Sequence, residues 1–366
     1  MLQDVIATTE NCRYCLMCRH VGPVELVTHR EAHSPHGWAL LVASVRRGLL
    51  EWNEETVGNL YTAPDGGNSR AWCVTSQPLP EALAAARAEV AQAGLAPQAA
   101  YKIQERVKQW RNPYREEAPQ AVEGQGEHAL FVGDAAVYLR PQTLAAARRL
   151  LAAAGVEPVL VGVGRNNAFF PSSLGFPETA LAVARENLEE LQQSRASRLF
   201  VLSPGDYFAF RQLYEERLDL PWPEKIRLQE VTVFLAGALE AGKLAFNRSE
   251  GMEQVAYVDP THAVRVPIRH EAPRRLLQAV LPADAELVEL FWRRERAHPA
   301  GNTALQFTRP EIAEKLTRAR LNDAQDAGAE VVVCDDPETL VHLERYAGEY
   351  GLEVQGLYEL LVECLQ

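Results

Sequence analysis

Four cysteines in the first quarter of the chain have the residue type and spacing best suited to chemistry. Cys12, Cys15 and Cys18 follow one another with two residues between them, and Cys73 is the next cysteine along the chain. Thiolates are soft ligands that select iron–sulfur clusters or zinc, and a tetrahedral all-sulfur shell suits both. Zinc sites usually come as two separated cysteine pairs, whereas three closely spaced cysteines wrap one cuboidal cluster better than one ion. We therefore expect one 4Fe–4S cluster on four ligands: Cys12, Cys15, Cys18 and Cys73. The alternatives are zinc, a disulfide, or a relic site without metal.

The spacing explains why the fourth ligand is expected so far along the chain. The run is similar to the bacterial ferredoxin pattern C-x2-C-x2-C-x3-C-P, with Gly22 in place of the last cysteine. In two-cluster ferredoxins the fourth cysteine of each run ligates the other run's cluster, so Cys73 would complete the first site. His20 is the rival fourth ligand, because imidazole can replace thiolate at such clusters. A second site would then have lost all its ligands, with small residues at each position: Gly22, Ala63, Gly66 and Ser69.

Length and composition narrow the class of protein. A chain of 366 residues has room for two or three domains with buried cores. Its net charge of -12 argues against nucleic acid or an anionic membrane surface as the main partner. Six cysteines, three of them within seven residues, form no disulfide framework and indicate a reducing compartment. With no secretion signal, and no apolar stretch approaching the ~18 residues of a membrane span, we expect a cytoplasmic protein without direct membrane insertion.

The elements that must position these residues divide into a helical part and an α/β part. Residues 1–115 show helical periodicity, most clearly at 36–52 and 80–94, and the polar segment 112–128 is the linker candidate. After it, alternating strands and helices predict parallel strands joined by right-handed crossovers. A strand-to-proline turn occurs twice, which indicates an internal duplication into domains at 127–225 and 226–366. The expected strands are 128–133, 159–163, 198–202, 254–258, 287–290 and 330–333, and the expected helices are 142–154, 177–193 and 310–327.

Short motifs accompany this organisation along nearly the whole chain. They include Gly133-Asp134, Leu174-Gly175-Phe176, Ser203-Pro204-Gly205-Asp206 and Tyr257-Val258-Asp259-Pro260-Thr261-His262. With the cysteine run, they make the chain resemble iron–sulfur proteins built from a ferredoxin domain and two cysteine-rich CCG domains, such as the glycolate oxidase iron–sulfur subunit and the heterodisulfide reductase catalytic subunit. The resemblance implies a fold of mixed α+β and α/β class. A helical ferredoxin-like domain would be followed by two duplicated α/β CCG-like domains with parallel sheets.

The chain departs from this family at the cysteines of the CCG motifs. Polar residues stand at the motif positions, and the cysteine pair that names the domain aligns with Asn166 and Asn167 and, in the second copy, with His298 and Pro299. We expect both CCG-like domains to have kept the scaffold and lost the metal. Cys334 and Cys364 are expected to be buried small hydrophobic residues. The residues that replace the motif cysteines are Asp134, Ser203, Asp206, Thr261, Asp336 and Thr339.

The leading functional hypothesis is an electron-transfer subunit of an oxidoreductase complex, with no catalytic residues of its own. The resemblance implies a flavin-linked dehydrogenase or electron-transfer flavoprotein as the partner in a hetero-oligomer. The alternative is a structural or assembly subunit, with a redox-silent cluster and the CCG-like domains as a docking scaffold. A hydrolase or isomerase that uses the Asp and His side chains at the strand ends is a third hypothesis. A locally basic docking surface is expected from four side chains beside the ligands: Arg13, Arg19, His20 and Arg70.

Overall fold

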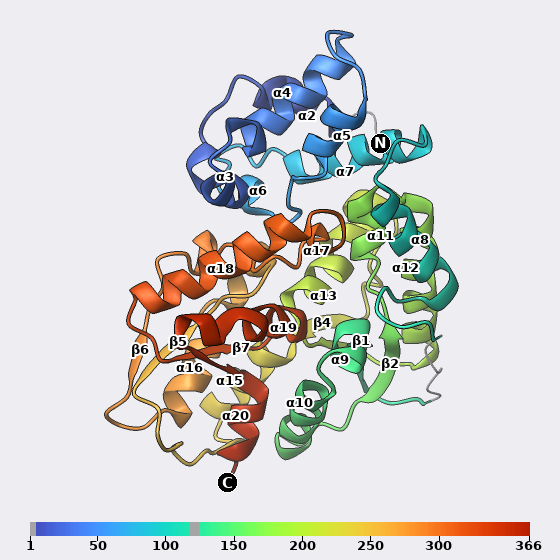
Figure 1. Cartoon of the computed structure of the whole chain (residues 1–366). Helices are drawn as coiled ribbons and strands as arrows, with labels where there is room; N and C mark the ends of the chain where they lie inside the picture. The colour runs from blue at the N-terminus through green and yellow to red at the C-terminus, as the bar shows by residue number, and fades with distance from the viewer. Residues whose placement is uncertain (1–4, 118–123) are drawn as a thin grey trace.

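The computed structural model describes residues 5–117 and 124–366, which form a helical unit and two α/β units (Figure 1). The expected linker at 112–128 therefore lies partly outside the described residues. The α/β units contain two four-stranded, all-parallel sheets, which confirms the α/β architecture expected from the strand and helix pattern. Among the described helices, none has the length and apolar character needed to span a membrane.

The helical unit consists of short helices around the cysteine run. Helix α4 begins after Ser34, whose hydroxyl oxygen accepts a hydrogen bond of 3.0 Å from the Gly37 N–H, with Pro35 in the first turn. It ends at Arg46, earlier than expected, because Gly48 takes a left-handed conformation two residues later. The helices are α2 (Thr8–Cys12), η1 (Arg19–Val21), α3 (Pro23–Thr28), α4 (Pro35–Arg46), α5 (Glu54–Leu60), α6 (Asn68–Ala71), α7 (Leu79–Gln92) and α8 (Gln98–Trp110).

The first α/β unit has the strand order β2-β1-β3-β4. Its first three strands lie where the apolar runs predicted them, whereas β4 was not expected. The sequence of β4 is RLQE, a polar edge strand without an apolar run, and it extends the first sheet past the boundary expected at residue 225. The elements are β1 (His128–Gly133), α9 (Asp134–Tyr138), α10 (Pro141–Ala153), β2 (Val159–Arg165), α11 (Phe169–Leu174), α12 (Pro177–Gln193), β3 (Arg198–Val201), α13 (Pro204–Phe208), η3 (Ala209–Leu213), α14 (Tyr214–Leu218) and β4 (Arg227–Glu230).

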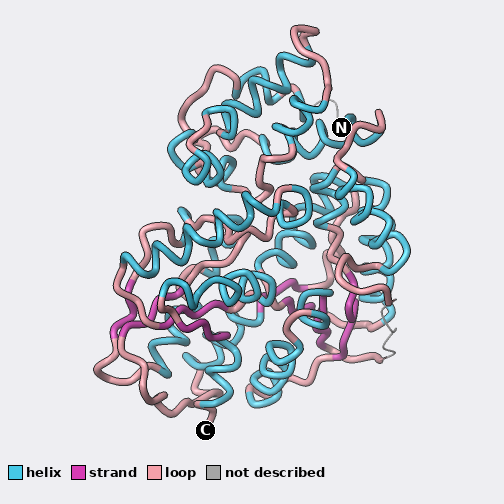
Figure 2. The backbone as a smooth tube through the Cα atoms, viewed as in Figure 1, coloured by secondary structure: helices cyan, strands magenta, loops and turns pink. Residues whose placement is uncertain are grey.

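The second α/β unit repeats this topology with the order β6-β5-β7-β8. Its polar edge strand β8 was also missed from the sequence. Figure 2 shows the strands of both sheets as two groups below the helical unit. The main elements are α15 (Val231–Glu240), β5 (Gln254–Tyr257), η4 (Ala263–Arg265), α16 (Ala272–Val280), β6 (Glu286–Val288), α17 (Leu305–Thr308), α18 (Pro310–Asp326), β7 (Val331–Cys334), α19 (Pro337–Tyr346), β8 (Glu353–Gly356) and α20 (Leu357–Glu363).

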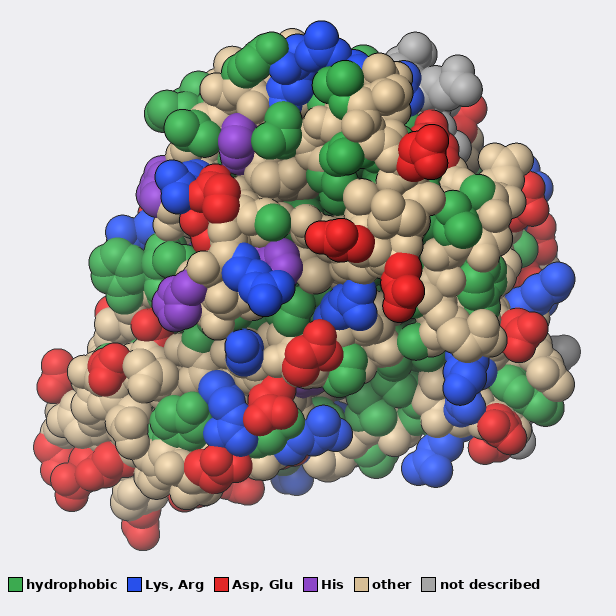
Figure 3. Space-filling view, turned by 45° about the horizontal axis from the view of Figure 1, so that its top comes forward, with side chains coloured by type: hydrophobic (Ala, Val, Ile, Leu, Met, Phe, Trp, Pro, Cys, Tyr) green, Lys and Arg blue, Asp and Glu red, His purple; other side chains and the backbone are tan. Residues whose placement is uncertain are grey.

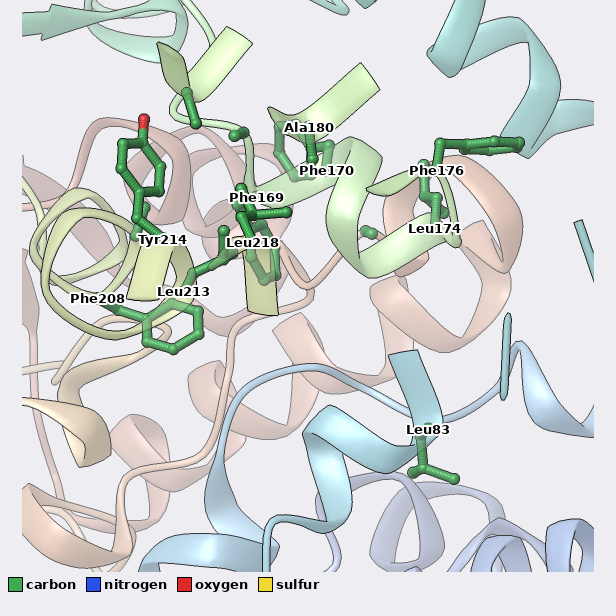
Figure 4. Close-up of a cluster of buried hydrophobic side chains, with 14 of the residues drawn as sticks. Leu83, Phe169, Phe170, Leu174, Phe176, Ala180, Phe208, Leu213, Tyr214 and Leu218 are labelled. Atoms are coloured by element: carbon green, nitrogen blue, oxygen red, sulfur yellow. The ribbon is translucent and has the colours of Figure 1, made fainter. Parts of the chain in front are cut away.

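One hydrophobic core joins the helical unit to the first α/β unit. It contains Leu83 of α7 together with Phe169, Phe170 and Phe208 (Figure 4). The Leu174-Gly175-Phe176 motif lies at this contact. Gly175 has a φ of 97°, and a Cβ there would lie 2.5 Å from the Arg87 carbonyl oxygen, so only glycine fits.

A buried ion-pair cluster joins all three units. Asp65 and Glu81 of the helical unit face Arg217, next to the end of α14, and Arg265, in η4. Asp65 lies 2.6 Å from Arg217 and 2.8 Å from Arg265, measured between oxygen and nitrogen. Although burial acts to raise it, the two guanidinium groups lower the pKa of Asp65 to about 2. Removing one partner from such a cluster leaves a buried charge, so these contacts hold the units in one arrangement.

Candidate metal centre

The four cysteines expected as ligands line one cavity of about 300 Å³ in the helical unit. Cys12 ends α2, and Cys15 and Cys18 lie in the tight turns that lead to η1. Cys73 comes from a different segment, two residues after the end of α6. All four are free thiols. Tertiary structure thus brings Cys73 to the cysteine run from a distant part of the chain.

The raised thiol pKa values reflect burial first and the nearness of the other sulfur atoms second. Burial and the neighbouring thiols raise the pKa of Cys12 to about 12 and that of Cys18 to about 11. At Cys73 burial acts in the same direction, but hydrogen bonds from Thr75 and from backbone N–H groups lower the pKa overall. The Gln77 N–H lies 3.3 Å from the Cys73 sulfur. With pKa values raised this far, the half-buried Cys12 and Cys18 thiols stay protonated near neutral pH, so binding of a metal group there would release protons.

Among the described residues, the four thiols line one cavity without the arrangement that holds a single metal ion. Within residues 5–117 and 124–366, no group of three or more His, Cys, Asp and Glu side chains is arranged to hold a single metal ion. Four thiols around a cavity of about 300 Å³ nevertheless form a complete soft ligand set. A 4Fe–4S cluster is larger than one ion, and its ligands are four cysteine thiolates. An all-sulfur donor set suits either a cluster or zinc.

His20 does not line this cavity. Its imidazole is exposed and packs edge-on against Trp72, with 5.5 Å between the ring centroids. His36, which the sequence analysis did not single out, is the histidine at the cavity wall. Its Nε2 lies 2.7 Å from the Arg13 carbonyl oxygen, so that nitrogen is already engaged. The Nδ1 atom of His36 has no hydrogen-bond partner among the described residues. His36 and Cys73 thus both reach the cavity, whereas His20 does not.

The positions of the expected second site lie at contacts that the described residues make elsewhere in the chain. Ser69 lines the cavity of the four cysteines instead. Near Gly66 the second α/β unit packs against the helical unit, because a Cβ on Gly66 would lie 3.5 Å from Pro299. The Asn68 amide also donates a hydrogen bond of 2.7 Å to the Ala297 carbonyl oxygen. Contacts between units therefore occupy the region where the second site was expected.

Exposed apolar side chains stand next to the cysteines in the sequence, and one of them, Met17, lines the cavity. We call them the cysteine-loop patch: Tyr14, Leu16, Met17 and Val74, which are 75%, 54%, 60% and 81% exposed. An exposed apolar group beside a functional cavity is typical of an interaction surface.

The expected basic surface is not found, because the arginines beside the ligands are paired within the chain. Arg13 pairs with Glu10 at 2.7 Å, Arg19 with Glu25 at 3.2 Å, and Arg70 with Glu216. Figure 3 shows basic, acidic and hydrophobic side chains interspersed over one face of the molecule, with no broad basic stripe on that face.

The residues that replace the motif cysteines meet elsewhere, in a cavity between the two α/β units. Asp134 follows β1, Asn166 and Asn167 follow β2, and Ser203 and Asp206 follow β3. Thr261, His262 and Asp336 reach the same cavity from the second unit. Motif alignment placed these residues at strand ends, but only the tertiary structure brings the two sets together.

The structure corrects one part of that alignment. In the first unit, Asn166 and Asn167 precede Ala168, which has a φ of 72° and leads into the short helix α11. In the second unit the same geometry occurs at 302–304, where Ala304 has a φ of 68° and leads into α17. Asn302 and Thr303 are therefore the counterparts of the first pair, and the placement at His298 and Pro299 was wrong. The longer connection after β6 hid this correspondence in the sequence.

Cys334 and Cys364 are both buried, as expected for small hydrophobic residues. Neither lines the cysteine cavity. No family model and no curated protein matches this chain, so its own residues must carry the functional conclusion.

Proposed function

We propose that the protein is an electron-transfer subunit of an oxidoreductase complex. The observation that supports this most is the meeting of four free thiols on one cavity of about 300 Å³. A 4Fe–4S cluster bound there would accept and release single electrons. The cluster ligands in this proposal are Cys12, Cys15, Cys18 and Cys73.

The chain's own residues would tune this site. The Gln77 N–H and the Thr75 hydroxyl both lie 3.3 Å from the Cys73 sulfur, where they can stabilise negative charge. Met17, Pro35 and Leu79 form apolar parts of the wall and limit access of water. Hydrogen bonds to sulfur and solvent exposure are two of the factors that set the potential of such clusters.

The cysteine-loop patch is the surface on which an electron partner would dock. Its residues are sequence neighbours of the four cysteines and Met17 lines the cavity, so a redox centre bound there would lie close to the ligands. The resemblance of the chain to CCG-domain proteins favours a flavin-linked dehydrogenase or an electron-transfer flavoprotein in a hetero-oligomer. Because the neighbouring arginines are paired internally, this encounter should depend on apolar contact more than on ionic strength.

The first experiment measures metal content after anaerobic purification. One complete set of four thiolates supports one cluster, so we expect about four irons and four sulfides per chain. About eight irons would show that a second site exists. One zinc per chain and no sulfide would show that the site binds zinc and not a cluster.

The second experiment tests electron transfer itself. The anaerobic protein is mixed with a flavin-linked dehydrogenase encoded beside it and with the substrate of that enzyme, and the cluster is followed by EPR. We expect the signal of a reduced cluster. A stable complex without reduction would contradict the proposal and favour the structural alternative.

A specific observation supports that alternative as the second candidate. The segment that carries Cys73 is also a contact between units: Arg70 pairs with Glu216 of α14, and the Trp72 indole N–H donates a hydrogen bond of 3.0 Å to the Glu295 carbonyl oxygen. A cluster at Cys73 would therefore brace both contacts. In this case metal loss should loosen the whole chain, while the cluster stays redox-silent in the complex.

A further inference from the structure

The cavity between the α/β units lies where parallel sheets commonly bind ligands. In each sheet the strand order changes direction at one point. This switch point lies between β1 and β3 in the first sheet and between β5 and β7 in the second. Ligands bind outside the carboxyl ends of strands at such switch points. Here residues after β1, β3 and β7 line one shared cavity. Two switch points thus open onto a single space.

Carboxyl groups dominate the lining of this cavity. The Asp134 carboxylate accepts a hydrogen bond of 2.8 Å from the Asn166 amide, and Asp206 accepts one of 2.8 Å from Asn167 and one of 2.9 Å from Ser203. Asp336 accepts a bond of 2.7 Å from the Thr339 N–H at the start of α19. Amide and hydroxyl donors therefore hold the carboxyl groups in place.

These carboxyl groups lack a cationic partner in the cavity. Its described lining residues include Asp134, Asp206, Asp336 and Glu338, but neither lysine nor arginine. Burial is the main cause that raises the pKa of Asp134 to about 6, of Asp206 to about 7 and of Asp336 to about 6. Mutual repulsion acts in the same direction at Asp206, because Asp134 and Asp336 lie nearby. A positive charge in this space would relieve both effects.

Two buried side chains on the cavity wall have polar atoms without partners. Asn166 is 1% exposed, and its amide donates to Asp134 while its carbonyl oxygen Oδ1 accepts nothing. The Nδ1 atom of His262, a residue 5% exposed, is also unpartnered. Burial and the nearby Arg265 charge lower the pKa of His262 to about 3, so the ring is neutral. The Asn166 oxygen is thus an unused acceptor, and His262 Nδ1 accepts as well when the ring proton is on Nε2. This arrangement suits a ligand that donates hydrogen bonds.

We propose that this cavity binds the primary ammonium group of a small organic amine. An ammonium group carries the missing positive charge and three N–H donors for the free acceptors. Phe169, which packs against the His262 ring at 4.6 Å between centroids, adds an aromatic wall suited to a cation. A bare metal ion fits less well, because no group of metal-binding side chains within the described residues is arranged around one ion.

The size of the cavity limits the ligand. Its free volume of about 50 Å³ corresponds to roughly four water molecules at ~10–15 Å³ each. An ammonium group with one or two carbons fills that space, and any longer substituent must extend toward solvent. This proposal does not depend on the cluster in the helical unit.

The test uses the full chain and methylammonium chloride as the probe. Saturation-transfer NMR on the methyl protons, at constant ionic strength and pH 7.5, measures weak binding directly. We expect a dissociation constant of roughly 10 mM, near the limit for a ligand of two heavy atoms. Tetramethylammonium, which has the charge but no N–H donor, should give no signal.

Two variants locate the site. Asp206→Asn and Glu338→Gln each remove one carboxyl group and keep its shape, and each should weaken methylammonium binding about tenfold or more. Asp219→Asn, at an exposed carboxylate outside the cavity, is the matched control and should bind normally. Thermal unfolding establishes that each variant is folded.

Any of four outcomes would overturn the proposal, the last two of which concern competing ligands. One is absence of methylammonium binding to the folded wild-type chain. Another is unchanged affinity in both cavity variants. The third is equally strong binding of tetramethylammonium. The fourth is displacement of methylammonium by micromolar Mg²⁺, which would indicate a metal site instead.

Discussion

The two cavities of this protein differ in volume and in the hydrogen bonds that their lining side chains make. The cysteine cavity has about 300 Å³ of free volume and four thiols that do not hydrogen-bond one another, and exposed apolar side chains stand next to the cysteines in the sequence. The cavity between the α/β units has about 50 Å³, and its carboxyl groups are tied to amides and hydroxyls. Hydrogen bonds hold the carboxyl groups of the second cavity in place, although the Asn166 oxygen there has no partner among the described residues. The thiols of the first cavity form the soft ligand set on which the proposed cluster depends.

The largest expected effect is the loss of the cluster in Cys73→Ser. Serine replaces a thiolate ligand with a hard hydroxyl that binds iron–sulfur clusters poorly. We expect iron and sulfide content to fall from about four per chain to near zero. Cys364→Ser, at a cysteine outside the cavity, should keep the cluster. Normal iron content in Cys73→Ser would show that the fourth ligand is His20, His36 or solvent and not Cys73.

The next effect concerns the ion-pair cluster that joins the units. Arg265→Met leaves Asp65 and Glu81 buried with one cationic partner fewer. We expect the free energy of unfolding in urea to fall by about 3–5 kcal/mol. Arg275→Met removes an exposed arginine that pairs with Glu240 and should change it by less than about 1 kcal/mol. Equal effects would show that the buried cluster does not hold the units together.

A smaller effect is expected in the pH dependence of stability. Burial raises the folded-state pKa of Asp206 from 3.8 to about 7, so the folded chain holds this proton more tightly than the unfolded chain. The resulting stabilisation is complete below pH 3.8 and is lost as the pH rises through about 7.

In Asp206→Asn this contribution is absent, so its unfolding free energy should fall less than that of the wild type between pH 4.5 and 7.5. Urea denaturation at these two values measures the difference. Asp219→Asn should follow the wild type. Parallel pH profiles for all three proteins would argue against a buried, protonated Asp206.

The smallest effect concerns the surface of the cysteine cavity. Val74→Asp places a charge in the cysteine-loop patch, where Val74 is 81% exposed. We expect the second-order rate of cluster reduction by the flavoprotein to fall about tenfold, as for an interface residue contributing about 1.4 kcal/mol. Iron content and stability should not change.

Leu49→Asp is the control, because Leu49 is 70% exposed and lies outside the patch. Equal reduction rates in the two variants would show that the patch is not the docking surface.

Much of the fold could be predicted because apolar runs report burial directly. β1 occupies 128–133, as its apolar sequence predicted, and α12 begins at Pro177 and ends at Gln193. The edge strands β4 and β8 were missed because an edge strand needs few apolar residues and their sequences, RLQE and EVQG, are mostly polar. Their place in the sheets comes from backbone pairing with β3 and β7.

For the candidate sites, the sequence by itself determined which residues have suitable chemistry. Cysteine spacing singled out Cys12, Cys15, Cys18 and Cys73, and motif alignment identified the polar replacements at the strand ends. Both inferences rest on local order along the chain, which the sequence states directly.

Only the tertiary structure decided which of these residues meet. It placed Ser69 at the first cavity, paired Arg19 and Arg70 with carboxylates, and identified Asn302 as the counterpart of Asn166. It also brought the switch points of the two sheets to one shared polar cavity. Such contacts join residues 200 or more positions apart, as between Asp65 and Arg265 and between Asn68 and Ala297. They depend on how whole units pack, which local sequence patterns do not record.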